Sequence, residues 1–251
     1  SALFSILLIT LNHVHAQDTL RYSIAEENCL LIKHTFPNTR IHFVSLHEDE
    51  VTCHQTLLRL LPNLDFCSFY QLKQFGHRNI QGTFSKKSFL FDPNRMFSEV
   101  GLKASLSSLN KRKYTSDIFN EINGFANSIL KEITSVLEND YVVALHNNWN
   151  EKFSILSYIN SADTDSIFVA DTLEPDHFYL VTQLPDYQFF KSKNRNVVLQ
   201  SPSAPDDGSL SIYCQKKNIP YINIEVEWGA DSIQEVMILE TYSYLSEKLK
   251  H

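Results

Sequence analysis

The sequence predicts an α/β sandwich of three layers, in which helices cover both faces of a mixed, mostly parallel β-sheet. Two observations predict this fold. Short and almost continuously apolar runs recur between turn-forming residues, which is typical of strands buried on both faces of a sheet. Longer stretches with helical spacing of apolar residues separate these runs, so strands and helices alternate along the chain.

Five runs rich in Val, Ile, Phe and Tyr are the predicted strands, and they cover residues 40–46, 141–145, 177–182, 196–199 and 221–225. Four helices are expected at about 52–61, 116–137, 209–217 and 233–250. Ser232 and Glu235 have the spacing of a capping box and indicate where the last helix begins. In such sheets the chemistry gathers in loops beyond the carboxyl ends of the strands.

Composition limits the domain count and the class of partner. The chain has 251 residues, of which 43% are hydrophobic, and no linker or shift of composition divides it. We therefore expect one domain over residues 17–251. The net charge of -7 argues against a nucleic-acid partner, because phosphate binding needs a concentrated Lys/Arg face.

The first residues resemble the end of a secretory signal peptide. Residues 2–11 form an apolar run too short to span a bilayer, and small residues follow at the positions before Gln17. We expect residues 1–16 to be a signal peptide remnant and the mature protein to be periplasmic or secreted, without a membrane anchor. An oxidising compartment would allow disulfides, in any of three pairings, among Cys29, Cys53, Cys67 and Cys214.

Three residues are candidate metal ligands. His47 follows the first predicted strand, and Glu50 comes three residues later, where a helical turn would bring both side chains to one side. His146 follows the second strand as His47 follows the first. Two histidines and a glutamate, with an open fourth position, suit one catalytic Zn²⁺. His54, further along the same helix, is a competing ligand, whereas His42 lies inside a strand and is expected in the core.

Four motifs in this order resemble the carboxypeptidase A-like zinc metallocarboxypeptidase superfamily. They are His47-Glu-Asp-Glu50, Asp92-Pro-Asn94-Arg95-Met-Phe97, Leu145-His146 and Gly208-Ser-Leu210. The resemblance covers most of the chain, from Arg40 to the last helix. It implies a zinc hydrolase fold with the metal on His47, Glu50 and His146.

The resemblance also implies roles for further residues. Asn94 and Arg95 would hold a substrate carboxylate, because guanidinium grips carboxylate through two parallel hydrogen bonds. Leu210 would also contact substrate. Arg78, seventeen residues before Arg95, would stabilise the oxyanion.

The catalytic base is one of two glutamates in the last predicted strand. Glu225 and Glu227 are two residues apart, so their side chains point to the same face. Counting from Gly208, as the resemblance suggests, favours Glu225. Glu227 lies nearer the strand exit and stays the alternative base.

Two departures bear on the substrate. Asp49 stands where pancreatic-type enzymes carry an arginine, and the loop 201–207 lacks their substrate-covering tyrosine, with Ser203 near its place. The length is similar to that of the smaller bacterial amidases and deacylases of the superfamily. The primary hypothesis is a hydrolase of amide bonds next to a free carboxylate, on peptides or cell-wall peptide fragments.

The first alternative is an N-acyl amino acid amidase or deacylase of the succinylglutamate desuccinylase and aspartoacylase type. The second is a non-catalytic binding module on the same fold. An absent glutamate base would indicate the module, and Glu225 is present. The sequence gives no prediction of oligomeric state.

Overall fold

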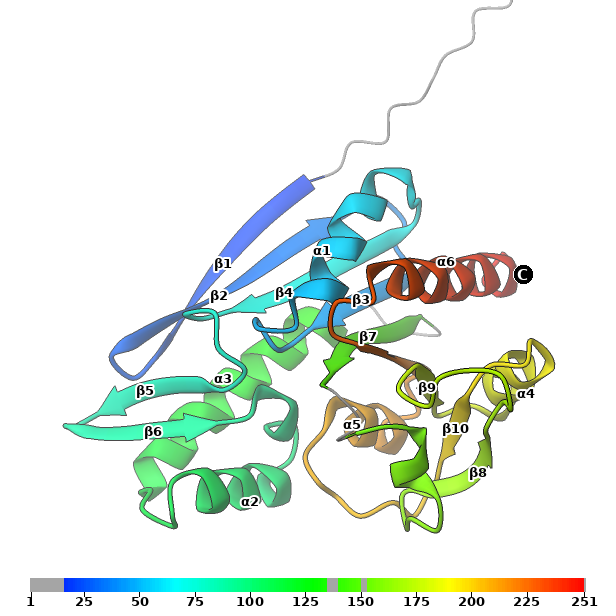
Figure 1. Cartoon of the computed structure of the whole chain (residues 1–251). Coiled ribbons are helices and arrows are strands. Elements are labelled where there is room, and N and C mark those ends of the chain that lie inside the picture. Colours follow the sequence, from blue (N-terminus) through cyan, green and yellow to red (C-terminus); the bar gives the residue numbers. More distant parts are fainter. Residues whose placement is uncertain (1–15, 135–139, 150–152, 251) are drawn as a thin grey trace, which may run out of the picture.

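A nine-stranded mixed β-sheet runs through the centre of the protein, with helices on both faces (Figure 1). The computed structural model describes residues 16–134, 140–149 and 153–250. The strand order is β1-β2-β4-β3-β7-β11-β9-β10-β8, and β5 and β6 form a separate hairpin. The strands are β1 Ala16–Ile24, β2 Glu27–Thr35, β3 Ile41–Ser45, β4 Cys67–Lys73, β5 Ile80–Phe84, β6 Lys87–Phe91, β7 Tyr141–Asn148, β8 Thr164–Phe168, β9 Phe178–Val181, β10 Val197–Gln200 and β11 Tyr221–Glu227.

The parallel pairs lie mainly at the centre of the sheet. β3 is parallel to β4 and β7, and β7 is parallel to β11. The edges are antiparallel, formed by β1 with β2 on one side and β10 with β8 on the other. The carboxyl ends of β3, β7 and β11 therefore meet at one edge of the sheet, where the predicted site residues lie.

Two apolar cores fill the space between the sheet and the helices. The helices are α1 Val51–Leu60, α2 Glu99–Leu109, α3 Ser116–Thr134, α4 Leu184–Ser192, α5 Leu210–Lys216 and α6 Asp231–Lys248, and the 3₁₀ turns are η1 Leu61–Asn63, η2 Pro93–Arg95 and η3 Ile155–Tyr158. α2, α3 and α5 pack on one face, and α1, α4 and α6 pack on the other. Alternate residues of a strand serve opposite cores: Val142 and Ala144 of β7 face the first, and Val143 and Leu145 face the second. The predicted three-layer α/β fold is confirmed.

Several of the elements that the sequence did not predict have polar or irregular compositions. β1 and β2 form an edge hairpin that mixes polar and apolar residues, so no continuous apolar run marks them. α2 contains Gly101 and three serines, which are weak helix formers, and α4 begins with Leu184-Pro185. The last residues of the predicted helix 116–137 lie outside the described residues.

The predicted capping box of the last helix is wrong. α6 begins at Asp231, after Ala230, and no side chain caps it. The backbone N–H of Gly229, which has a φ of +89°, donates to Thr52 Oγ1 at 2.8 Å. This hydrogen bond to α1 holds the turn at Gly229, and the helix begins directly after that turn, before Ser232.

The four cysteines are all buried free thiols, so the structure contains no disulfide among Cys29, Cys53, Cys67 and Cys214. The predicted signal peptide falls outside the described residues except for Ala16, which begins β1. Secretion therefore stays a prediction. In the described part of the chain, no helix is both long and apolar enough to cross a membrane.

Candidate active site

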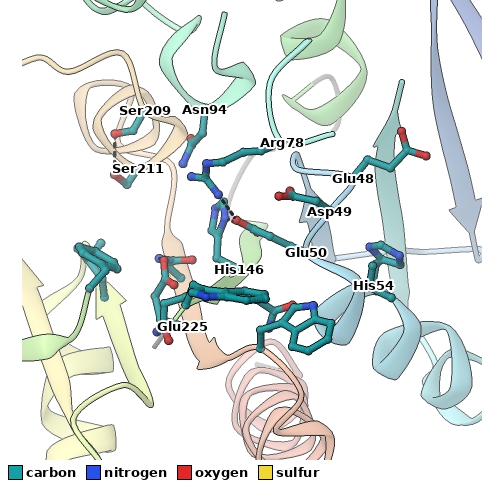
Figure 2. A pocket seen from close by; sticks show the side chains of 18 of the residues that line it. Glu48, Asp49, Glu50, His54, Arg78, Asn94, His146, Ser209, Ser211 and Glu225 are labelled. Carbon is teal, nitrogen blue, oxygen red and sulfur yellow. Dashed lines mark hydrogen bonds and ion pairs between the residues drawn. The ribbon is translucent and has the colours of Figure 1, made fainter. Parts of the chain in front are cut away.

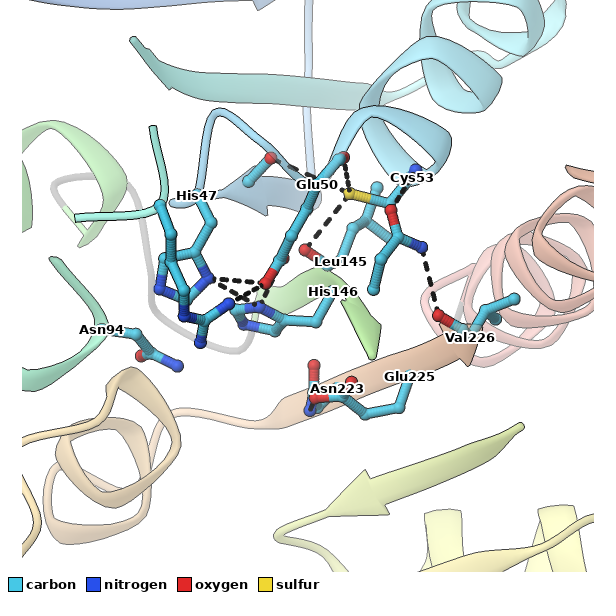
Figure 3. Close-up of polar contacts among 12 residues, drawn as sticks. His47, Glu50, Cys53, Asn94, Leu145, His146, Asn223, Glu225 and Val226 are labelled. Carbon is cyan, nitrogen blue, oxygen red and sulfur yellow. Dashed lines mark hydrogen bonds and ion pairs between the residues drawn. The ribbon is translucent and has the colours of Figure 1, made fainter. Parts of the chain in front are cut away.

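The predicted metal ligands converge at the carboxyl edge of the sheet (Figure 3). His47 follows β3, Glu50 is the residue just before α1, and His146 lies on β7. β3 and β7 are parallel neighbours, which is why residues 99 positions apart in the chain become adjacent in space. The spacing of His47 and Glu50 brings two of the ligands together, and the pairing of β3 with β7 adds His146 as the third.

The three side chains form one compact cluster. Glu50 Oε1 lies 2.8 Å from His47 Nδ1, and Glu50 Oε2 lies 2.9 Å from His146 Nδ1. The two Nδ1 atoms are 3.3 Å apart. One ligand atom from each residue lies within 4.8 Å of the other two, and all three residues are buried. His47, Glu50 and His146 fit a single metal site.

Asp92 orients His47 through the ring nitrogen that does not face the cluster. The Nε2–H group of His47 donates to Asp92 Oδ1 at 2.8 Å, which leaves Nδ1 directed toward Glu50 and His146. A carboxylate behind a ligating imidazole is a common second contact in metal sites, because it fixes the tautomer and raises the basicity of the ligand. The sequence placed Asp92 in a motif but gave it no role; only the fold reveals this contact.

Charge at the cluster favours a cation. Burial opposes a positive charge on His47, but the carboxylates of Glu50 and Asp92 outweigh it and raise its pKa to about 9. Burial would raise the pKa of Glu50, yet the two imidazoles hold it well below its usual range. Two imidazole nitrogens and one carboxylate are also one of the known donor sets of catalytic zinc.

Arg78 borders the same cluster. Its Nη1 donates to Glu50 Oε1 at 2.6 Å, and its Nη2 lies 3.9 Å from Asp92 Oδ2. The side chain is about half exposed and lines the pocket beside Glu50. Its predicted part in stabilising an oxyanion stays a prediction.

His54 and His42, the two other histidines near His47 in the sequence, have different surroundings. His54 is buried on α1 and is absent from the metal-type cluster, and burial together with Lys73 lowers its pKa. His42 is buried in β3, where Nδ1 lies 2.8 Å from Ser68 Oγ, as expected of a core histidine.

Glu225 faces the cluster from the neighbouring strand. β11 pairs with β7 so that Glu225 lies opposite His146. The side chain is buried, lines the pocket, and accepts a hydrogen bond from Asn223 Nδ2 at 2.9 Å. Burial and the nearby Glu50 carboxylate raise its pKa, partly offset by His146. A carboxylate with raised proton affinity beside a metal-type cluster has the properties of a general base.

Glu227 lies two residues further along the strand and is only partly buried. It pairs with Asn148 and is not among the residues that line the pocket. Its backbone N–H lies 3.3 Å from His177 Nδ1. The geometry therefore favours Glu225 as the candidate base.

Asn94 and Arg95 occupy η2, which is docked onto the start of α5. The Leu210 N–H donates to Asn94 Oδ1 at 3.0 Å, and the Phe97 N–H donates to the carbonyl of Gly208 at 3.0 Å. Gly208 has a φ of +79°, and a Cβ there would lie 2.5 Å from the Arg95 carbonyl oxygen. Only glycine permits this close approach.

Arg95 reaches the pocket, whereas Leu210 does not. Arg95 Nη1 donates to the Asn94 carbonyl at 2.8 Å and lies 3.4 Å from Asp207 Oδ2. Leu210 is 0% exposed and packs in the core, which contradicts its predicted contact with substrate. Its backbone N–H instead positions Asn94, because α5 begins there and turns the Leu210 side chain inward.

A cavity of about 1000 Å³ contains these groups (Figure 2). His47 is fully buried and is not among the residues that line the cavity, whereas Glu50 and His146 line it. Besides the predicted residues, the lining includes Asp49, Trp149, Tyr158, Asp207, Ser209, Ser211, Tyr221, Asn223 and Trp228. The sequence contained one usable signal for the tryptophans, since each follows a predicted site residue, His146 or Glu225, by three positions.

No protein-family model matches the sequence, and no curated protein matches it. Among solved structures, it is similar to murein-tripeptide amidase MpaA from Escherichia coli O157, with 14% identity over 90% of each chain and a TM-score of 0.48. It is similar to a succinylglutamate desuccinylase/aspartoacylase from Rhodobacter sphaeroides, with 10% identity over 98% of this chain and 69% of the other, and a TM-score of 0.47. N-formylglutamate amidohydrolase from Ralstonia eutropha JMP134 is 13% identical over 84% and 95%, with a TM-score of 0.43.

Each of these three similarities covers at least 84% of this chain. These relations are distant. What the site can do therefore depends on the residues of this chain.

Proposed function

We propose that the protein is a zinc-dependent hydrolase that cleaves an amide bond next to a free carboxylate, on a peptide or a cell-wall peptide fragment. One observation carries the proposal: a single cavity is lined by Glu50 and His146 of the metal-type triad, by the buried carboxylate of Glu225 and by Arg95. Each of these groups answers one requirement of the reaction.

His47, Glu50 and His146 would hold the metal, and Asp92 would keep His47 in the ligating tautomer. Bound zinc supplies a Lewis acid that lowers the pKa of water and polarises a carbonyl. The triad suits this role because one ligand atom from each of its three buried residues lies within 4.8 Å of the other two.

Glu225 would take the proton of the attacking water and pass it to the leaving amine. The hydrogen bond from Asn223 fixes the orientation of the carboxylate, and burial brings its pKa nearer to neutrality. Arg78 lines the same cavity and would donate to the oxygen that gains negative charge.

Asn94 and Arg95 would bind the carboxylate on the amine side of the scissile bond. Arg95 is held beside Asp207 at 3.4 Å, so an incoming carboxylate would compete with that exposed partner. A planar guanidinium can then form two parallel hydrogen bonds to the substrate.

The test compares one substrate as its free acid and as its amide. The wild type should hydrolyse the acid much faster, and Arg95→Ala should lower kcat/KM for the acid by roughly tenfold to a hundredfold, as expected for a lost hydrogen bond to a charged group. The amide rate should change little. Arg59→Ala is the matched control, because Arg59 is exposed and pairs with Asp231 on the surface.

Equal wild-type rates on acid and amide would contradict the proposal and indicate an endopeptidase. No hydrolysis of either would favour the non-catalytic binding module.

A second candidate is an N-acyl amino acid amidase or deacylase of the succinylglutamate desuccinylase and aspartoacylase type. Asp49 favours it, because this exposed carboxylate lines the pocket where a peptidase of the pancreatic type has an arginine. The Asn94–Arg95 pair serves both substrate classes. Comparing N-acyl amino acids with dipeptides and tripeptides of the same carboxyl-terminal residue separates the two.

A further inference from the structure

The only two tryptophans of the chain, Trp149 and Trp228, line the candidate active site together. Their ring centroids are 5.1 Å apart with an interplanar angle of 40°, and the residues are 57% and 49% exposed. Large apolar side chains left open to solvent within a functional cavity typically mark a binding surface. Neither residue has a part in the proposed catalytic steps.

The course of β11 places this pair along the cavity. Tyr221, Asn223 and Glu225 face the cavity from successive positions of one strand face, and Trp228 follows Glu225 by three residues. Trp149 and Trp228 each come directly after the last residue of a strand, β7 and β11, which are parallel neighbours, so the pair lies just beyond the carboxyl ends of these strands. The hydrogen bond from Gly229 to Thr52 fixes this end of the cavity against α1.

The carboxylate-binding groups lie toward the other end. Asn94 is bound to the start of α5, which packs on Tyr221 at the beginning of β11. Figure 2 shows Ser209, Ser211 and Asn94 at one end of the pocket and His54 of α1 at the other, with His146 between them. The cavity therefore extends from the level of Glu225 in two directions.

We propose that Trp149 and Trp228 bind a flat ring in the acyl part of the substrate. This rests on the proposed function: if the carboxylate of the leaving amine is held by Arg95 and the amide lies at Glu225, the acyl group extends toward the tryptophans. A ring cannot fit between indoles whose centroids are 5.1 Å apart, because stacking on both faces needs about 7 Å. The ring of the substrate stacks on the outer face of one indole and meets the edge of the other.

Binding can be measured without turnover, because all tryptophan fluorescence of the chain arises from this pair. The zinc-loaded Glu225→Gln protein is titrated with N-benzoylglycine, N-cyclohexanecarbonylglycine and N-acetylglycine. These probes share the carboxylate and differ in the acyl group. We expect the benzoyl compound to change the fluorescence and to bind about tenfold more tightly than the acetyl compound, the upper end of an aromatic pair interaction. Equal affinity of the benzoyl and cyclohexyl compounds would overturn the preference for a flat ring.

Hydrolysis provides the second readout, as the ratio of kcat/KM for the benzoyl and acetyl substrates. Trp228→Ala or Trp149→Ala should lower this ratio several-fold, and Trp228→Phe should retain most of it, because a flat ring remains. Leu184→Ala is the control, since Leu184 is a 53% exposed apolar residue that does not line the cavity. An unchanged ratio in both alanine variants would overturn the proposal.

The two proposals fail in different ways. Ring-selective binding without hydrolysis of any substrate would overturn the hydrolase and leave the ring-binding pair intact. Hydrolysis of free-acid substrates without a ring preference would support the hydrolase and overturn the ring-binding pair.

Discussion

Two clusters of buried charge lie on opposite faces of the sheet, and they are built differently. At the active site, Glu50 meets the imidazoles of His47 and His146. On the other face, Asp186 is 0% exposed and accepts hydrogen bonds from Tyr141, Tyr244 and Lys248, the first two at 3.1 and 2.7 Å.

The difference lies in what surrounds each carboxylate. Asp186 is surrounded by hydroxyl and ammonium groups that can all donate, so its charge is balanced by the protein itself. Glu50 also accepts a hydrogen bond from Arg78, but in the triad three atoms that can each donate an electron pair lie within 4.8 Å of one another. A buried carboxylate alone therefore does not indicate a functional site; convergence of acceptors does.

The largest effect should follow from removing one acceptor of the triad. The wild type should bind about one zinc per chain, and His146→Ala should bind none after dialysis, because only two of three protein ligands remain. His47→Ala and Glu50→Ala should behave alike. Metal content measured by mass spectrometry decides this, and Tyr244→Phe in the other cluster should retain zinc. Stoichiometric zinc in the His146→Ala protein would remove the triad from the metal site.

Replacing the candidate base, Glu225, should lower the rate of hydrolysis without changing the zinc content. Glu225→Gln should retain zinc and fold while kcat falls by about a hundredfold or more, because the amide cannot accept the proton of water. Steady-state kinetics with metal analysis measures both. Glu227→Gln is the matched control and should have a far smaller effect. The reverse ranking would make Glu227 the base.

The balanced cluster should matter for stability alone. Asp186→Ala leaves Lys248 and two tyrosine hydroxyls without their acceptor, which should lower the free energy of unfolding by about 2 kcal/mol. The effect is moderated because the Lys248 side chain is 31% exposed. Urea denaturation measures it. Zinc content and kcat per folded molecule should stay at wild-type values, and their loss would show that the two clusters are coupled through the sheet.

The smallest effect should come from replacing Asp92, which contacts His47 but is not one of the three predicted ligands. Asp92→Asn should weaken zinc binding by about tenfold while saturating zinc still fills the site, since the contact orients His47 without ligating. Competition with a chelator of known affinity measures the change. Asp117→Asn, on the exposed surface of α3, should leave zinc affinity unaltered. Complete loss of binding in Asp92→Asn would make Asp92 a ligand itself.

The sequence predicted those features that depend on local pattern. His47 and Glu50 are three residues apart, and the buried strands β3, β7 and β11 are apolar runs, so both could be read directly from the chain. The place of His146 followed from its position after a second strand, although only the register of β3 and β7 brings it to Glu50.

Features that depend on packing between distant segments escaped prediction. The contact between Asp92 and His47 requires η2 to fold back on the sheet, and the inward turn of Leu210 depends on where α5 begins. The start of α6 was misplaced because the tie between Gly229 and Thr52 outweighs the local Ser232–Glu235 signal. Edge strands such as β1 were missed because polar residues interrupt their apolar pattern.

The four buried thiols form a natural set of reporters for local opening. Cys29 and Cys214 belong to the apolar layer on one side of the sheet, and Cys53 and Cys67 belong to the layer on the other. A thiol reagent can reach each pair only when its own layer opens, because all four side chains are shielded in the native state. The order in which the pairs are alkylated would therefore reveal which side of the sheet loosens first, with no label introduced into the chain.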